Sequence, residues 1–154
     1  MCRLGISMYG YQAAPDTHKL IDLRPAMSVH ARITNVMTVP MSEGVSYGMN
    51  YRSPGSVKIC TVPIGYADGL IRLLSGKIDF AFNDRAVHQV GNICMDQCMA
   101  DITDIPDVKR GDTVTLLGEG MSIEDMANML DTNVDVIVCN ISVRVPRVYI
   151  NGDI

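Results

Sequence analysis

Residues 27–39 carry the pattern that most constrains the fold of this chain. Apolar side chains take the odd positions of this segment and polar side chains the even positions, with Asn35 and Val36 as the exceptions. Because successive side chains of a strand point to opposite faces, this period of two predicts one long, half-buried strand. His30 and Arg32 fall on its polar face, where we expect them to be solvated.

Short strands separated by turns are predicted for most of the remaining chain. Residues 77–82 and 86–90 predict a hairpin about Asn83-Asp84-Arg85. Pro63 places the predicted strand 57–65 at a sheet edge or a bulge, since proline cannot donate to a ladder. Further strands are predicted at 1–10, 100–102, 113–117, 132–138 and 143–150, with a loop at 11–26 and a short helical piece at 70–74.

One α-helix is predicted, around residues 122–130. Ser122 can cap its start, and Glu124 and Asp125 suit the positive end of the helix dipole. One apolar stripe follows, made of Ile123, Met126, Met129 and Leu130. Short strands with glycine and proline turns and a single helix predict a mainly β fold, either a barrel or a sandwich.

Composition argues against several classes of protein. A chain of 154 residues, 47% of them hydrophobic, suits a single domain with a proper core. A net charge of -4 without any lysine- or arginine-rich run argues against a nucleic-acid-binding surface. No apolar run approaches the ~20 residues of a membrane span, so we expect no span. No basic segment followed by an apolar one opens the chain, so we expect no signal peptide.

Cysteine usage indicates the redox compartment. The five cysteines are odd in number and none forms a Cys-x-x-Cys pair. Cys94 and Cys98 stand four positions apart, but no histidine lies close to them in the sequence. We therefore expect no metal site, and instead buried free thiols in a reducing cytoplasm.

Residues 46–51 form the stretch with the most chemical potential. Tyr47 and Tyr51 flank Gly48 there, directly after a predicted turn at 40–44. A phenol has an unperturbed pKa near ~10, so a tyrosine becomes a base only where its surroundings depress that pKa and a ligand can approach. The alternative is that both rings simply pack, with their hydroxyls hydrogen-bonded. The stretch alone leaves both interpretations open.

Four stretches, in order along the chain, resemble the C-terminal region of the fold-type III, pyridoxal-phosphate-dependent alanine racemases. They are Arg3-Leu4-Gly5-Ile6 with Tyr9-Gly10, Val45-Ser46-Tyr47-Gly48, Pro63-Ile64-Gly65-Tyr66-Ala67-Asp68-Gly69, and Ile93-Cys94-Met95-Asp96-Gln97. The run 141–148, Ile-Ser-Val-Arg-Val-Pro-Arg-Val, resembles the last strand of that family. Each motif alone is weak, but together they cover nearly the whole chain.

The resemblance implies a parent protein of two domains. An N-terminal α/β barrel would carry the cofactor lysine, and a β-rich C-terminal domain would follow it. Residues 1–10 would be the last strand of the barrel and residues 11–154 the C-terminal domain. The family interconverts L- and D-alanine in the cytoplasm, which supplies D-alanine for peptidoglycan. It works as a head-to-tail homodimer in which each site takes residues from both subunits.

The resemblance also assigns cofactor contacts near the N-terminus. Arg3 matches the arginine that faces the pyridine nitrogen of pyridoxal phosphate. Gly5 and Ile6 match backbone N–H donors to the phosphate, and glycine suits that role because it lets the backbone approach an anion closely. An arginine would not protonate the pyridine nitrogen, which weakens the electron sink and discourages side reactions such as transamination.

Substrate contacts are implied farther along the chain. Tyr47 matches the base that acts on the face of the substrate opposite the lysine, in the site of the partner subunit. Racemisation needs an acid–base group on each face of Cα, because the proton leaves one face and returns to the other. Met95 matches a residue whose backbone N–H contacts the substrate carboxylate, and Tyr66 and Arg72 fall where the family lines its access channel.

Two departures from the family pattern bear on the substrate. Asp135 stands where these racemases usually have a tyrosine that touches the phosphate and narrows the pocket. Asn92 stands where many members have an arginine in the access channel. An alternative is therefore a serine or broad-specificity racemase of the same family.

A non-enzymatic alternative is a β domain that only dimerises or binds. No lysine of this chain lies in a stretch that resembles the cofactor-lysine motif. We therefore expect the chain alone to be inactive, whichever enzyme it belongs to.

Overall fold

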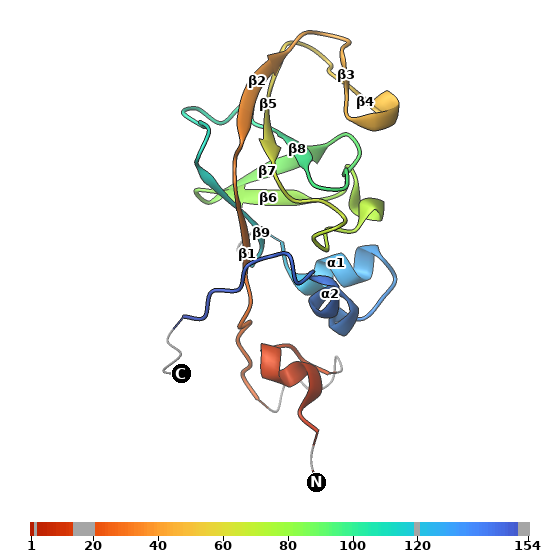
Figure 1. Ribbon diagram of the computed structural model, residues 1–154, viewed down its shortest axis with the longest axis vertical. Helices are drawn as coiled ribbons and strands as arrows, with labels where there is room; N and C mark the ends of the chain where they lie inside the picture. Colours follow the sequence, from red (N-terminus) through yellow and green to blue (C-terminus); the bar gives the residue numbers. More distant parts are fainter. Residues whose placement is uncertain (2, 14–20, 119–120, 151–154) are drawn as a thin grey trace.

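The computed structural model describes residues 1, 3–13, 21–118 and 121–150, and Figure 1 shows their arrangement. Within these ranges the chain forms nine strands, two α-helices and three 3₁₀ helices. The strands are β1 (Val29–Arg32), β2 (Asn35–Val39), β3 (Gly44–Val45), β4 (Tyr51–Arg52), β5 (Val57–Val62), β6 (Asp79–Phe82), β7 (Arg85–Val90), β8 (Cys98–Asp101) and β9 (Thr113–Leu117). The helices are η1 (Gly5–Tyr9), η3 (Tyr47–Met49), η4 (Arg72–Leu74), α1 (Ile123–Met129) and α2 (Val134–Asn140). The mainly β prediction is confirmed.

Seven strands form one antiparallel sheet in the order β1-β9-β6-β7-β8-β5-β2, and β3 pairs with β4 separately. The first and last strands of this order follow each other directly in the chain, because only Ile33 and Thr34 separate β1 from β2. The Ile33 N–H donates to the Asp112 carbonyl at 2.8 Å, and the Thr34 N–H to the Thr61 carbonyl at 2.9 Å. A single extended segment therefore borders both ends of the sheet, which must curl to meet it.

The prediction of one continuous strand at 27–39 is thus wrong, because the segment forms two strands, β1 and β2. The segment is extended, but it changes partner at Ile33, from β9 to β5. The alternation continues as far as Ile33, which is 1% exposed, whereas Met37 is 48% exposed in β2. Figure 1 shows the segment running along the long axis of the molecule. Periodicity reports which side chains are buried and cannot report a change of neighbouring strand.

The β6–β7 hairpin confirms its prediction. Phe82 pairs with Arg85, so Asn83 and Asp84 form a two-residue turn. Their φ values are 46° and 61°, the left-handed conformation that a tight hairpin turn needs at both central positions. Asn and Asp tolerate this conformation better than other side chains. The strands predicted at 57–65, 100–102 and 113–117 correspond to β5, β8 and β9. The edge placement of the first is wrong, because β5 ends at Val62, before Pro63, and pairs with β2 on one side and β8 on the other.

Two hydrophobic clusters stabilise the fold. The main core joins the sheet to both α-helices and includes Phe80 at 0% exposed. A smaller cluster lies at the β3–β4 end and comprises Val39, Val45, Val57, Ile59, Val90 and Met99, with Tyr51 packed against it.

Helix α1 forms as predicted, and the Ser122 hydroxyl accepts the N–H of Asp125 at 3.0 Å. The predicted strand 132–138 is wrong, because the chain forms helix α2 there. Its β-branched side chains favour a strand. However, Ile137 and Val138 are buried together on one face and Val136 is 47% exposed, which is a helical spacing. None of the helices among the described residues is long and apolar enough to cross a membrane.

The predicted strand 1–10 is also wrong, since residues 5–9 form η1. Gly5 and Gly10 have φ values of 54° and 82°, which an extended strand does not allow. The Gly10 N–H donates to the Ser7 carbonyl at 3.1 Å and ends the helix. A Cβ at Gly10 would lie 1.7 Å from the Arg24 carbonyl oxygen, so only glycine fits this approach.

The last predicted strand, 143–150, does not form either. Arg147 donates from its guanidinium to the carbonyls of Ile141, Ser142 and Val145, so a side chain satisfies backbone groups that a ladder would otherwise pair. Val143 is 96% exposed. The backbone of this segment therefore bonds to the side chain of Arg147 instead of pairing with a neighbouring strand.

Candidate functional site

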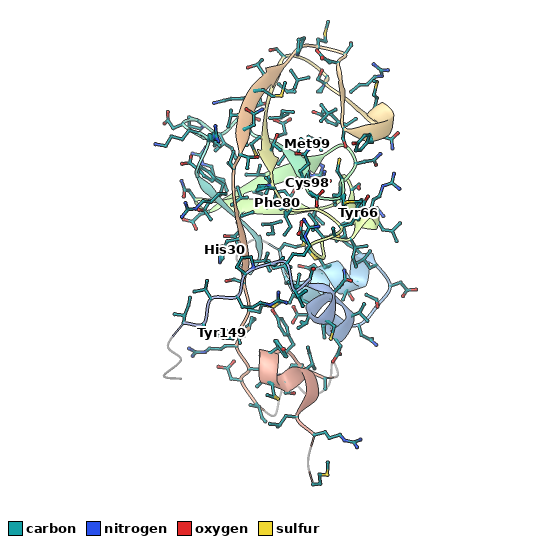
Figure 2. All side chains as sticks on the ribbon, viewed as in Figure 1. His30, Tyr66, Phe80, Cys98, Met99 and Tyr149 are labelled. Atoms are coloured by element: carbon teal, nitrogen blue, oxygen red, sulfur yellow. The ribbon has the colours of Figure 1, made fainter. Side chains whose placement is uncertain are left out.

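A cleft of about 1030 Å³ opens where three connections between strands meet. These are the β3–β4, β5–β6 and β7–β8 connections. The cleft is lined by Tyr47, Tyr66, Arg72 and residues 92–97, which include Met95. Figure 2 shows Tyr66 at one flank of the molecule and His30 at the opposite flank. Four of the site residues predicted from the sequence therefore share one cleft.

Tyr47 projects from a sharply bent backbone. Its side chain is 77% exposed. Around it, Ser46, Gly48 and Met49 have φ values of 68°, 76° and 48°. A non-glycine residue with positive φ is uncommon, and two of them within four residues need support from their surroundings. The neighbouring β7–β8 connection supplies this support.

Asn92 is the centre of that support. Its side-chain Nδ2 donates to the backbone carbonyl of Tyr47 at 2.6 Å, and its Oδ1 accepts from Asn50 Nδ2 at 3.4 Å. Its backbone carbonyl accepts the Ser46 hydroxyl at 2.6 Å. The chain also comes close at Gly91, where a Cβ would lie 2.8 Å from the Val45 carbonyl oxygen. Residues 45–50 are therefore fastened to the β7–β8 connection on both sides of Tyr47.

The two tyrosines of the 46–51 stretch have different surroundings. Tyr51 packs against the smaller hydrophobic cluster. Its burial, together with the nearby Asp101 carboxylate, raises its pKa, which disfavours the phenolate. Tyr51 therefore fits the packing interpretation, and the exposed Tyr47 is the one that a ligand can reach.

A close backbone contact joins the other two walls of the cleft. The Tyr66 N–H donates to the Cys94 carbonyl and the Ala67 N–H to the Met95 carbonyl, both at 3.0 Å. A Cβ at Gly65 would lie 2.2 Å from the Cys94 carbonyl oxygen and 2.4 Å from that of Met95. Only glycine lets these two segments approach so closely, and their hydrogen bonds fix the Met95 backbone.

Arg144 links the same two walls from outside. Its Nε lies 3.1 Å from Asp68 Oδ1, and one of its terminal nitrogens lies 2.6 Å from Asp96 Oδ1. The Asp68 side chain is only 11% exposed, and its second oxygen accepts the Gly65 N–H at 2.9 Å. Both oxygens of the Asp68 carboxylate therefore have a partner. Through Arg144, the fixed position of Asp68 also restrains Asp96 on the cleft wall.

Ser75 places Arg72 beside the cleft. The Ser75 hydroxyl donates to the Arg72 carbonyl at 2.6 Å and accepts the Ile93 N–H at 2.9 Å. Leu74, only 1% exposed, anchors η4 in the main core. The Arg72 side chain itself is exposed. A cation is thus held at the cleft on a short, well-anchored turn.

Four other predicted site residues do not line the cleft. Asp135 is exposed in the first turn of α2. Arg3, Gly5 and Ile6 lie at η1, at the end of the long axis opposite to β3 and β4 (Figure 1). Gly5 has open space around it, since no atom lies within 4 Å of the position where a Cβ would stand. Ile6 is 7% exposed and joins the main core.

The described cysteines are free thiols. Burial raises the pKa of Cys60 to about 11, and burial also raises the pKa of Cys98. Cys94 is buried beside the cleft, and its sulfur lies 3.3 Å from the Ser46 hydroxyl. Within the described part of the chain, no group of three or more His, Cys, Asp or Glu side chains could hold a metal ion.

Comparison with known protein families shows to which family this domain belongs. Residues 26–149 match the family described as alanine racemase, C-terminal domain. The chain belongs to this family. The match includes all four predicted residues that line the cleft.

Full-length alanine racemases resemble this chain over part of their length. The alanine racemase of Clostridium novyi is 43% identical over 99% of this chain, and that of Methanococcus maripaludis is 43% identical over 98%. A solved alanine racemase from Bacillus anthracis with bound L-Ala-P superposes with a TM-score of 0.88 at 35% identity, covering 96% of this chain. The chain spans 41% of the Clostridium novyi protein, 42% of the Methanococcus maripaludis protein and 39% of the Bacillus anthracis chain.

Sequence reasoning missed the residues that organise this alanine racemase C-terminal domain around its cleft. In the sequence Asn92 stands out only as a departure from the family pattern, and Arg144 only as part of a motif. Gly65 and Asp68 lie in one of the four family stretches. That motif could have indicated a close backbone contact, but no signal in the sequence pairs Asn92 with Tyr47.

Proposed function

We propose that this chain is the C-terminal domain of a pyridoxal-phosphate-dependent alanine racemase, and that its Tyr47 serves the site of a partner subunit. The supporting observation is the separation of the two candidate parts of the site, which lie at opposite ends of the long axis (Figure 1). One chain cannot bring Tyr47 and residues 3–6 into one site, whereas a head-to-tail dimer with two-fold symmetry can. The enzyme would act in the cytoplasm and supply D-alanine for peptidoglycan.

The start of η1 fits the phosphate of the cofactor. Gly5 leaves its backbone open, with no atom within 4 Å of a Cβ position. The first N–H groups of a helix have no partner inside that helix, so those of Gly5 and Ile6 would hold the phosphate. The exposed Arg3 would face the pyridine ring. When bound, pyridoxal phosphate supplies the electron sink that makes the Cα proton of the amino acid removable.

Tyr47 would move the proton on one face of Cα. It stands 77% exposed on a loop held by Asn92, as a side chain donated to another subunit must. A base in this role has to be fixed within hydrogen-bond reach of the proton that it takes. A lysine from the barrel would serve the opposite face, since no residue of this chain matches it.

The remaining cleft residues would orient the substrate. The Cys94 carbonyl, which shares its peptide unit with the Met95 N–H, accepts the Tyr66 N–H at 3.0 Å, so the Met95 N–H is held in place for a substrate carboxylate. Tyr66 and Arg72 would line the channel, where the cation of Arg72 attracts the carboxylate of the zwitterionic amino acid. Alanine is the proposed substrate, because the matching family and its relatives are alanine racemases. Asp135, on which the serine alternative rests, would belong with Arg3, Gly5 and Ile6 at the cofactor phosphate and not at the cleft of Tyr47.

Mixed dimers of the full-length enzyme test this proposal. One subunit carries Tyr47→Phe and the other carries a substitution of the barrel lysine, and each homodimer is inactive. If Tyr47 serves the partner's site, each mixed dimer regains one intact site. Random mixing should then restore about one quarter of the wild-type activity, since half of the dimers are mixed and each has one intact site of two.

Two results would contradict the proposal. In the first, mixed dimers form but show no activity, which would mean that Tyr47 and the lysine serve a site in the same subunit. Residues 11–154 act as a binding or dimerisation module if Tyr47→Phe alone leaves racemisation intact.

A further inference from the structure

We infer that Asn92 is the positioning residue that sets the orientation of Tyr47, through a two-sided bridge across the bend at 46–50. This inference rests on the proposed function, because it assigns a role to the residue that supports the proposed base. Asn92 would act through Tyr47 and not by contact with the substrate.

The orientation of the Asn92 amide is determined by its two neighbours. Nδ2 lies 2.6 Å from the Tyr47 carbonyl oxygen, and Oδ1 lies 3.4 Å from Asn50 Nδ2. If the Asn92 amide were flipped, its Oδ1 would face the Tyr47 carbonyl oxygen and its Nδ2 would face the Nδ2 of Asn50, so neither hydrogen bond could form. Asparagine supplies both the donor and the acceptor. The arginine that stands here in many members of the family has no acceptor for Asn50.

The segment that Asn92 bridges needs such support. Ser46 and Met49 have φ values of 68° and 48°, a region that side chains other than glycine populate sparsely. The two bonds of the Asn92 amide fall within this bend, at Tyr47 and Asn50. The main-chain carbonyl of Asn92 accepts the Ser46 hydroxyl at 2.6 Å, immediately before the tyrosine. One residue therefore contacts the side chain before Tyr47, the backbone carbonyl of Tyr47 and a side chain three positions after it.

Asn92 also lines the cleft, so a direct contact with the substrate is the competing explanation. The two explanations differ in one measurable respect. A residue that acts only through the Tyr47 hydroxyl becomes unimportant once that hydroxyl is gone, because mutations within one functional unit are not additive. A residue that touches the substrate keeps its effect in both backgrounds.

The experiment is a double-mutant cycle in the full-length enzyme with pyridoxal phosphate. Asn92→Ala removes the bridge, and Asn92→Asp keeps the size and the acceptor but replaces the donor to Tyr47. Asn128→Asp, an exposed position in α1, makes the same chemical change away from the cleft. We expect Asn92→Ala and Asn92→Asp to lower kcat about tenfold to a hundredfold with little change in KM, within the range that a misplaced general base costs. In the Tyr47→Phe background both should lower kcat less than about twofold.

Hydrogen exchange supplies a readout that does not depend on activity. The amides of the 45–50 peptide should exchange faster in the Asn92 variants than in the wild type, because local opening governs exchange. Peptides from α1 and β9 should not change in any variant, and Asn128→Asp should match the wild type throughout. The same measurement detects an Asn92→Ala enzyme that has lost activity by unfolding, because exchange would then rise in every peptide. In that case the Asn92→Asp variant tests the positioning role instead.

The outcomes separate the inference from the proposed function. A full loss from Asn92→Asp in both tyrosine backgrounds would overturn the positioning role and leave Tyr47 as the base. Wild-type kcat together with unchanged exchange at 45–50 would overturn it as well. Full activity of Tyr47→Phe would instead refute the proposed function itself, and the inference with it. A loss confined to the Tyr47 background, with faster exchange at 45–50, supports it.

Discussion

The two ends of this domain are ordered by different forces. Among the described residues, the main core comprises 28 buried side chains, from the sheet, from both α-helices and from segments outside them. The smaller cluster at the β3–β4 end comprises only six buried side chains. Beyond those six, the bend that carries Tyr47 is held by polar contacts from Ser46 and Asn92. Burial of apolar side chains is the dominant favourable term in folding, and its contribution is roughly proportional to the apolar area removed from water. Hydrogen bonds give little net stability, but they fix a direction.

The difference shows how the fold presents a reactive side chain to another molecule. A tyrosine that must reach a partner cannot be held by burying it. Its backbone has to be fixed instead, and the ring left 77% exposed. Substitutions at the cleft should therefore alter chemistry at constant stability, and those in the main core should do the reverse.

The largest effect is expected at the cleft. Tyr47→Phe in the full-length enzyme keeps the ring but removes the proton acceptor, and one general base contributes about 10²–10⁴-fold to a rate. We expect kcat for racemisation to fall by that factor, while the midpoint of thermal unfolding stays within about 1 °C of the wild type, since surface changes are nearly neutral. Circular dichroism and a coupled racemase assay check both. A comparable loss of stability would show that the ring is also structural.

Phe80→Ala addresses the main core. The side chain is 0% exposed, and truncating a buried phenylalanine costs about 3–5 kcal/mol through lost burial and the cavity that remains. Urea denaturation should show this decrease in the free energy of unfolding. The enzyme that remains folded should keep its KM for alanine. A change in KM at moderate temperature would mean that the core and the cleft are not separable.

Gly65→Ala tests the junction between the two regions. Its Cβ would lie 2.2 Å from the Cys94 carbonyl oxygen, and backbone atoms cannot move away as a flexible side chain can. We expect a loss of about 1–3 kcal/mol in stability together with a higher KM, because the Met95 backbone must shift. Gly55→Ala is the matched control. No atom lies within 4 Å of its Cβ position, so stability should stay within about 1 kcal/mol of the wild type.

An effect that builds up over several pH units is expected in alkaline solution. The pKa of Cys60 rises with burial to about 11, above its value in the unfolded chain. The unfolded state therefore loses its proton first, so the stability is fully present below about pH 8.5 and is lost as pH rises toward 11. The slope for one group is at most about 1.4 kcal/mol per pH unit. Urea titrations at several pH values should give a shallower slope for Cys60→Ala, and an identical slope would assign the effect to other groups.

The sequence allowed prediction where local patterns and tertiary contacts agree. The hairpin and the Ser122 cap are local, and both form as predicted, although Arg85 of the predicted turn already belongs to β7. Helix α2 does not, because its valines and isoleucine favour a strand in isolation and become helical only when Ile137 and Val138 pack into the main core. At 143–150 the contacts of Arg147 with carbonyl groups replace a strand, and no pattern of apolar residues encodes them.

The candidate site was predicted in part for a similar reason. Tyr47, Tyr66, Arg72 and Met95 lie in motifs that resemble a family, and the structure brings them to one cleft. Asn92 meets Tyr47 across 45 positions of the chain through a single amide. Contacts of this kind depend on the register of several strands at once, so they appear only when the strands are paired.

The shared segment of β1 and β2 also has a consequence for synthesis. β2 meets β5 early, since Thr34, which directly precedes β2, bonds to Thr61 of β5, 27 positions away. β1 meets β9 late, since His30 and Thr115 are 85 positions apart. A ribosome releases the N-terminal residues first, and long-range pairs form slowly. β1 must therefore wait with an unpaired edge until β9 has emerged, and a nascent chain paused between residues 101 and 113 would expose that edge to its neighbours.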